Sequence, residues 1–187
     1  MKKSDFFLHR IKYIKKLKEG AICVYPTDTI YGIGCDATIY DSVAKIRLLK
    51  KRSKKPFSII LPDKSWIYHY CDVSPIYTRY IEKLPGPYTL ILKLKTEHNL
   101  AANVVCGLNH IGVRIPDHWF STVVKELKRP FITTSLNYSG MPHITEIEQI
   151  PFEMKQHIDI IIDDGPCKGK PSTIIDLTKD EVEIIER

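Results

Sequence analysis

The chain has 187 residues, 43% of them hydrophobic, and a net charge of +6 at neutral pH. This length is enough to bury one core and is typical of a single domain, so we expect one domain over residues 1–187. No apolar run approaches the roughly 20 residues that a membrane span requires, and the basic N-terminus does not resemble a signal peptide. We therefore expect a cytoplasmic protein without a membrane segment.

The cysteines and the charge narrow the class of protein further. The cysteines are odd in number, widely spaced and without a CxxC pair, which argues against a zinc site and a disulfide framework. We expect reduced, mostly buried thiols at Cys23, Cys35, Cys71, Cys106 and Cys167. The positive charge favours an anionic partner such as a nucleic acid, nucleotide or phosphate, although a solvated basic surface explains it equally well.

The hydrophobic pattern predicts helices and strands that are mixed along the chain. The first half of the chain is predicted to contain a helix over 4–18 ending at Gly20, a strand over 21–25, a loop over 26–34, a helix from Asp41 to about Lys51, a strand over 57–61, and a helical region over 63–83 with a break near Ser74. The second half is predicted to contain strands over 88–94 and 111–116, a helix over 117–128, a strand over 131–135 and a helix over 145–157. Three strands follow, over 158–163, 172–178 and 182–186. This order predicts an α/β domain with a mixed sheet.

Several common catalytic and nucleotide-binding motifs are missing from the sequence. The segment YGIGCDA lacks the third glycine of a dinucleotide fingerprint, and no GxxxxGK[ST] motif occurs. No GxSxG elbow surrounds Ser135, and no pair of histidines has the HExxH spacing. A Rossmann site, a P-loop, a serine hydrolase and a zinc protease therefore have no support.

What remains is a set of loops rich in hydroxyl groups and cations. They are PTDTIYGIG, LLKKRSKKPF, TTSLNYSG and KPST. Each has an ordinary structural explanation, because basic residues complement a helix C-terminus and hydroxyl side chains are frequent in turns and caps. Likewise, Arg114 can project from an exposed strand face.

The order and spacing of these segments resemble the YrdC-like family, the L-threonylcarbamoyladenylate synthases. The resemblance runs through GAICVYPTDTIYGIG, LLKKRSKKPF, LPGPYTLILK, GVRIPDH, TTSLNYSGMP and KPSTIIDLT. It implies an open, twisted mixed α/β sheet with flanking helices around a concave basic cavity. It also implies synthesis of threonylcarbamoyl-AMP from L-threonine, bicarbonate and ATP, with Mg²⁺ carried by the ATP and no dedicated protein metal site. Partner proteins would then transfer the threonylcarbamoyl group to tRNA.

The resemblance assigns roles to residues by position. The catalytic set that orients ATP would be Lys50 and Arg52 from the KxR motif, with Ser135 and Asn137 from the SxN motif. Lys55 and Arg187 would be further ATP contacts. The L-threonine site would comprise Thr27, Arg114, Thr133 and Ser172. An arginine clamps a carboxylate with two hydrogen bonds, and fixed cations stabilise charge that develops on phosphate, so the residue types suit this chemistry.

Two departures from the family pattern keep alternatives open. The spacing from Arg52 to Pro56 is one residue shorter than usual, and Ile60 replaces a histidine that contacts threonine in many members. One alternative is a YciO-like RNA-binding protein that lacks the full synthase activity. Another is an adenylating enzyme for a different amino acid. Lys51 and Lys54 are expected to be solvated.

Overall fold

The computed structural model describes residues 1–52 and 55–187, so Lys54 lies outside the described residues. The helices are α1 (Lys3–Leu8), α2 (Arg10–Lys18), α3 (Tyr40–Leu49), α4 (Ser65–Tyr70), α5 (Thr78–Ile81), α6 (Ala102–Val105), α7 (Phe120–Leu127) and α8 (Phe152–Lys155), with 3₁₀ turns η1 (Pro75–Tyr77) and η2 (Ile147–Gln149). The strands are β1 (Cys23–Tyr25), β2 (Gly32–Gly34), β3 (Ser58–Ile60), β4 (Cys71–Asp72), β5 (Tyr88–Leu94), β6 (His110–Arg114), β7 (Phe131–Ser135), β8 (Ile160–Ile161), β9 (Thr173–Asp176) and β10 (Glu183–Ile185).

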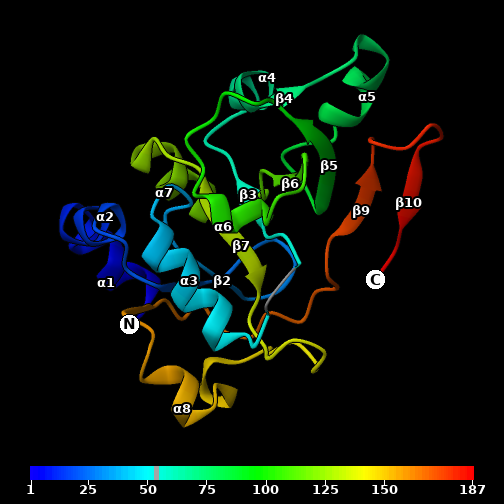
Figure 1. Cartoon of the computed structure of the whole chain (residues 1–187). Helices are drawn as coiled ribbons and strands as arrows, with labels where there is room; N and C mark the ends of the chain where they lie inside the picture. The colour runs from blue at the N-terminus through cyan, green and yellow to red at the C-terminus, as the bar shows by residue number, and fades with distance from the viewer. Residues whose placement is uncertain (53–54) are drawn as a thin grey trace.

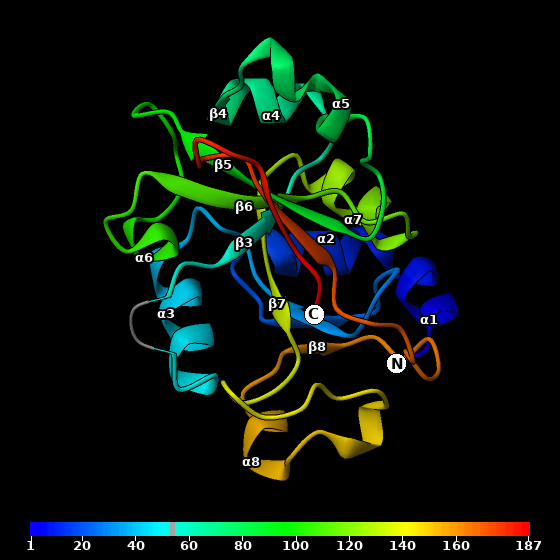
Figure 2. The same ribbon diagram turned by 90° about the vertical axis from the view of Figure 1, so that its right-hand side faces the viewer.

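One open mixed sheet organises the described chain. Its strand order is β10-β9-β5-β6-β3-β7-β2-β1-β8, with β4 paired to β5. Three pairs, β3 with β6, β5 with β9 and β1 with β8, are parallel, and the other pairs are antiparallel. Helices α4 and α5 lie beyond one end of the assembly and α8 beyond the other (Figures 1 and 2). The predicted open mixed α/β sheet with flanking helices is confirmed.

Alternation along the strands places apolar side chains in two buried clusters. The larger cluster includes Leu90 and Leu92 of β5 with Val113 of β6, all buried. The second cluster packs α1, α2 and α7 against the sheet through residues such as Phe6 and Phe120. Because side chains alternate between faces, the neighbouring positions on β5 and β6 are left for a polar surface. That surface carries the site described below.

Several predicted boundaries need correction. Residues 26–34 were expected to be a loop, but residues 32–34 form β2, which pairs with β1 and β7. The helix over 4–18 is split at His9, and the helix over 145–157 is reduced to η2 and α8 on either side of Pro151, which has no amide hydrogen to continue a helix. Gly20 has a φ of +94°, so the prediction that a glycine ends the first helical segment is confirmed.

Two expectations about composition can also be compared with the structure. Cys23, Cys35 and Cys71 are buried, Cys167 is half-buried and Cys106 is exposed, so the expectation that the thiols are mostly buried is confirmed. Within residues 1–52 and 55–187, no helix combines the length and the apolar character that crossing a bilayer requires.

Candidate functional site

A cavity of about 450 Å³ lies over the polar face of the sheet. Thr89 of β5, Arg114 of β6 and Thr133 of β7 line it, at positions that alternate with core residues. Gly112 allows the strands to pack closely there, since a Cβ atom at this position would lie 2.4 Å from the Ser58 hydroxyl oxygen. Among its described lining residues, three are arginines and none is a carboxylate, so the cavity wall favours an anionic ligand.

Arg114 is the most deeply buried cation of this wall. Only 7% of the residue is exposed, and its guanidinium lies 3.0 Å from the Asp28 carboxylate and 3.2 Å from the Thr29 hydroxyl. Burial lowers the pKa of Arg114, while Asp28 favours its charged form. The buried Nε atom has no hydrogen-bond partner among the described residues. The side chain therefore combines a fixed orientation with an unused donor beside the cavity.

The PTDTIYGIG segment is both self-capped and part of the cavity wall. The Thr27 hydroxyl donates to the Ile30 carbonyl at 2.8 Å and accepts from the Thr29 amide at 3.1 Å. Asp28, besides pairing with Arg114, accepts from the Asp117 amide at 3.0 Å. The hydroxyl groups of this segment therefore cap the local backbone and also form the cavity wall, because the local hydrogen bonds hold the wall in one conformation. Thr27 and Thr133 both line the cavity, as the resemblance implied.

Arg52 also lines the cavity, beside Thr134 of β7. Its guanidinium donates to the Pro56 carbonyl and, at 3.3 Å, to the Lys55 carbonyl, and it lies 4.9 Å from the centre of the Phe57 ring. The Thr134 hydroxyl is 3.5 Å away. Burial, followed by the nearby Arg47, lowers the pKa of Arg52. Arg52 and Pro56, which are close in sequence, are thus joined by a direct hydrogen bond.

Lys50 does not line the cavity, contrary to the role expected for it. It is 2% exposed, and its ammonium group donates to the Ser135 carbonyl, the Asn137 carbonyl at 2.9 Å and the Asn137 side-chain oxygen at 2.8 Å. Its own carbonyl accepts from the Ser139 amide at 3.1 Å. Burial, followed by the charge of Arg52, lowers the pKa of Lys50 to about 7. Lys50 therefore holds the loop that presents Ser135 and Asn137.

The remaining residues of the SxN loop and of its surroundings divide into two groups. Ser135 and Asn137 line the cavity, and the Ser135 hydroxyl donates to the Asn137 side-chain oxygen at 2.7 Å. Lys55 is exposed and is not among the residues that line the cavity. Its backbone carbonyl accepts a hydrogen bond from Arg47 at 3.1 Å. The structure thus places Ser135 and Asn137, but not Lys55, where the resemblance put them.

Ser172 and Arg187 close the cavity together. The Arg187 guanidinium donates to the Ser172 carbonyl at 3.0 and 3.1 Å and to its hydroxyl at 2.9 Å. The same hydroxyl lies 2.7 Å from the Thr89 hydroxyl. Both residues line the cavity as expected, but the Ser172 hydroxyl is already engaged by protein groups, so its contribution is to hold Arg187 in place.

Some lining residues were not identified from the sequence. They include Tyr31, Ser58, Thr89, His110 and His143. Ser58 and Thr89 had a detectable signal, since each is a polar residue within a mostly apolar strand and therefore marks the open face. Ile60, by contrast, is fully buried in the second apolar cluster and is not among the lining residues, although it pairs with Arg114 across β3 and β6.

Comparison with known protein families shows which family the chain belongs to. The model named for Sua5, YciO and YrdC, described as "Telomere recombination", matches residues 15–187. The chain belongs to this Sua5/YciO/YrdC family. A Methanocaldococcus jannaschii relative is 37% identical over 92% of this chain and 82% of its own length. The threonylcarbamoyl-AMP synthases of Bos taurus and Bacillus subtilis are 31% and 32% identical over 88% of this chain, which spans 62% and 49% of their lengths.

Solved structures of the family agree with this placement. The Pyrococcus abyssi Sua5 structure in complex with L-threonine matches with a TM-score of 0.82 and 29% identity, over 92% of this chain and 52% of that one. The Escherichia coli YciO structure matches with a TM-score of 0.83 and 25% identity, over 94% of this chain and 87% of that one. The fold is thus common to both named branches of the family.

Proposed function

We propose that this protein is an ATP-dependent L-threonylcarbamoyl-AMP synthase that serves the threonylcarbamoyl modification of tRNA adenosine in the cytoplasm. One observation carries the proposal: a single cavity is lined by Arg114, held by Asp28 and Thr29, together with Arg52 and the Ser135–Asn137 loop. Arg114 suits an amino-acid carboxylate, and Arg52 together with the Ser135–Asn137 loop suits a polyphosphate. The family relatives named threonylcarbamoyl-AMP synthase and the Sua5 complex with L-threonine support this division.

In the amino-acid half, Arg114 binds the carboxylate of threonine. Asp28 and Thr29 both accept hydrogen bonds from Nη2 of Arg114, which fixes the orientation of the guanidinium in the cavity wall. Thr27 and Thr133 supply short polar groups in a wall that suits a small hydroxylated side chain. An arginine held in one orientation loses little conformational freedom on binding, which favours the amino acid over larger anions.

In the phosphate half, Arg52 and Arg187 offset the negative charge of ATP, and Ser135 and Asn137 orient it. Lys50 acts through these two residues by holding their loop. Lys55, although exposed here, has a long side chain that provides a further contact with the phosphates. The described residues of the cavity wall offer hydroxyl and amide oxygens and none of them is an aspartate or glutamate, so we expect Mg²⁺ to arrive with the ATP phosphates, whose charge it neutralises.

The reaction then needs no nucleophile from the protein. The threonine amine attacks CO₂ derived from bicarbonate and loses a proton, which forms a carbamate. A carbamate oxygen attacks the α-phosphorus of ATP, and the bond from that phosphorus to the pyrophosphate oxygen breaks. The products are threonylcarbamoyl-AMP and pyrophosphate. Catalysis consists of positioning the reactants and stabilising the charge on the departing pyrophosphate. Partner proteins complete the transfer to tRNA.

Pyrophosphate release by the purified protein tests this proposal. With ATP, Mg²⁺ and bicarbonate, we expect release to depend on L-threonine and to be much slower with serine, valine or no amino acid. Arg52→Ala and Ser135→Ala should each abolish release, whereas Arg79→Ala, an exposed arginine on α5 outside the cavity, should retain it. Full activity in Arg52→Ala, or equal rates with every amino acid, would contradict the proposal.

A second candidate is a YciO-like RNA-binding protein without full synthase activity. One observation favours it: the apolar Ile60 stands where the resemblance to the synthases implies a histidine. This function predicts RNA affinity with a steep salt dependence that ATP and threonine do not change, together with no pyrophosphate release from folded protein.

A further inference from the structure

A second cleft, of about 710 Å³, continues the polar face of the sheet beyond the first cavity. On β5, Thr89 and Ile91 line the first cavity and Lys93 lines the second, at positions that alternate along one face, and Lys95, just beyond the end of β5, also lines the second. His110 of β6 lines both and pairs with Lys93 in the strand register. The two cavities are thus neighbours on one continuous surface, joined at His110.

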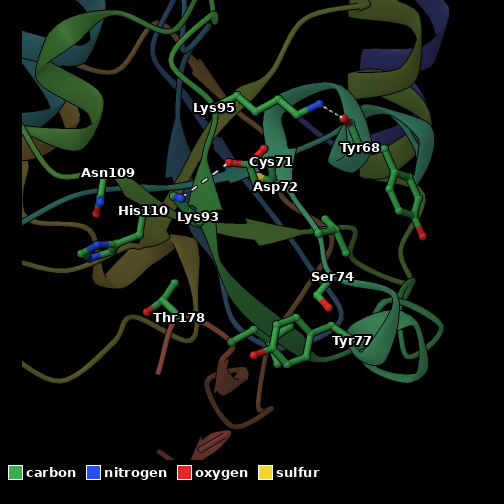
Figure 3. A pocket seen from close by; sticks show the side chains of 12 residues that line it. Tyr68, Cys71, Asp72, Ser74, Tyr77, Lys93, Lys95, Asn109, His110 and Thr178 are labelled. Atoms are coloured by element: carbon green, nitrogen blue, oxygen red, sulfur yellow. Dashed lines mark hydrogen bonds and ion pairs between the residues drawn. The ribbon is translucent and has the colours of Figure 1, made fainter. Parts of the chain in front are cut away.

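The two lysines of this cleft differ in how firmly they are held. Lys95 donates to the Tyr68 carbonyl at 2.7 Å, which fixes it at one end of the cleft (Figure 3). Lys93 is 66% exposed, and its partner Asp72, 54% exposed, lies 4.0 Å away. An exposed pair at that separation contributes little, so a stronger anion can displace Asp72 from Lys93. Asp72 is the only carboxylate among the described lining residues.

The other end of the cleft provides a different surface. Tyr77 and Thr178 lie at the end opposite Lys95, with Ser74 nearby (Figure 3). Tyr77 is half-buried and packs against the core, so its ring is held in place. Ser74 and Thr178 are exposed residues, and the Thr178 hydroxyl donates to the Asp176 carboxylate at 2.6 Å. A fixed aromatic ring suits stacking with a flat heterocycle, and the hydroxyls suit its polar edge.

We propose that this cleft binds a nucleotide unit of a single-stranded nucleic acid, with a phosphate at Lys93 and the base against Tyr77. Cations along one wall combined with an aromatic ring are the features by which proteins hold single strands. The exposed Lys93, Ser74 and Thr178 leave the rim open, which suits a ligand that continues beyond the cleft rather than an enclosed small molecule. The strand would reach the edge of the first cavity at His110. The inference stands on this geometry and not on the proposed activity.

Fluorescence anisotropy with a labelled single-stranded oligoribonucleotide tests the site on the full chain without turnover. We expect Lys93→Ala to weaken binding about fivefold and to reduce the salt slope by roughly 0.7, as expected for one lost phosphate contact on a single strand. Tyr77→Ala should weaken binding about tenfold, in the range of one lost stacked base. Asp72→Asn should tighten binding about twofold, because it removes the competing carboxylate. Lys125→Ala, an exposed lysine on α7 outside the cleft, is the matched control.

Three outcomes would overturn the inference. The first is binding by Lys93→Ala and Asp72→Asn that equals that of the unmodified protein, with both variants shown to be folded. The second is AMP competing as tightly as the oligonucleotide, since the cleft would then take free nucleotides. The third is a polyglutamate peptide competing equally well, because stacking would then play no part. Lys93→Ala should retain pyrophosphate release, so failure of this inference is distinguishable from failure of the proposed activity.

Discussion

Two lysines, one beside the first cavity and one in the second cleft, lie in opposite environments. Lys50, below the first cavity, is 2% exposed and donates to oxygens of Ser135 and Asn137. Lys93, in the second cleft, is 66% exposed, with a carboxylate oxygen 4.0 Å away. The first lysine holds a loop in one conformation and has no donor left for a ligand, whereas the second is weakly paired and can contact one. Burial and the number of acceptors, and not the charge itself, therefore separate a positioning lysine from a binding lysine.

The same contrast extends to the neighbouring groups. Around the first cavity, Arg114, Arg187 and Arg52 are each oriented by protein oxygens before any ligand arrives. Orientation before binding reduces the entropy lost in the complex and is what an enzyme needs for a charge that develops briefly. Around the second cleft, Lys93 and Ser74 are exposed. Such a surface suits a ligand that binds and leaves without chemistry.

The largest effect should come from breaking the buried pair of the first cavity. Arg114→Ala leaves the Asp28 carboxylate, only 10% exposed, without its cation. Removing one partner of a buried ion pair costs about 3–5 kcal/mol, and the variant also loses the proposed carboxylate clamp. We expect this loss of unfolding free energy in urea and no detectable threonine-dependent pyrophosphate release. Arg114→Ala with unchanged threonine-dependent activity would remove the carboxylate clamp from the proposal.

Releasing the loop at the same end should have the next largest effect. Lys50→Met keeps the length of the side chain but leaves the Ser135 and Asn137 oxygens without their donor, at a cost of about 1–3 kcal/mol for the unsatisfied groups. If Lys50 acts by positioning, hydrogen exchange of amides near Ser139 should accelerate, and KM for ATP should rise. A raised KM for ATP with unchanged amide exchange near Ser139 would instead indicate that Lys50 contacts ATP directly.

Much of the fold could be predicted from the sequence, and the misses have physical causes. The strands β5, β6 and β7 carry enough apolar alternation to be recognised, and the order of the motifs gave the family. β2 was missed because its GIG sequence has little strand propensity and is held by pairing with β1 and β7, which is a tertiary effect. The inward position of Lys50 was missed for a similar reason. Adjacent basic residues look alike in sequence, and only packing shows which side chain turns inward.

The pH dependence of the unfolding free energy tests the lowered pKa of Lys50 without a ligand. In the unfolded chain, Lys50 keeps its proton up to its ordinary pKa of 10.5, whereas in the fold its pKa is lowered to about 7. Between these values the unfolded state binds more protons, so the contribution of Lys50 to the unfolding free energy becomes more favourable as the pH rises. The difference in stability between the unmodified protein and Lys50→Met should therefore grow from pH 7 to pH 9. A constant difference across this range would show that the Lys50 pKa is not lowered.

The smallest effect should come from the exposed pair of the second cleft. Lys93 and Asp72 are 66% and 54% exposed and 4.0 Å apart, so water and salt screen their attraction. We expect Lys93→Ala and Asp72→Asn each to change the unfolding free energy by less than about 0.5 kcal/mol in urea denaturation. A loss comparable to that of Lys50→Met would mean that this pair helps to hold β4 against β5, and the contrast between a structural and a ligand-binding lysine would no longer hold. A negligible change in stability, together with the opposite shifts in oligonucleotide affinity expected above, requires that Lys93 act on a ligand, because a structural role would move stability first.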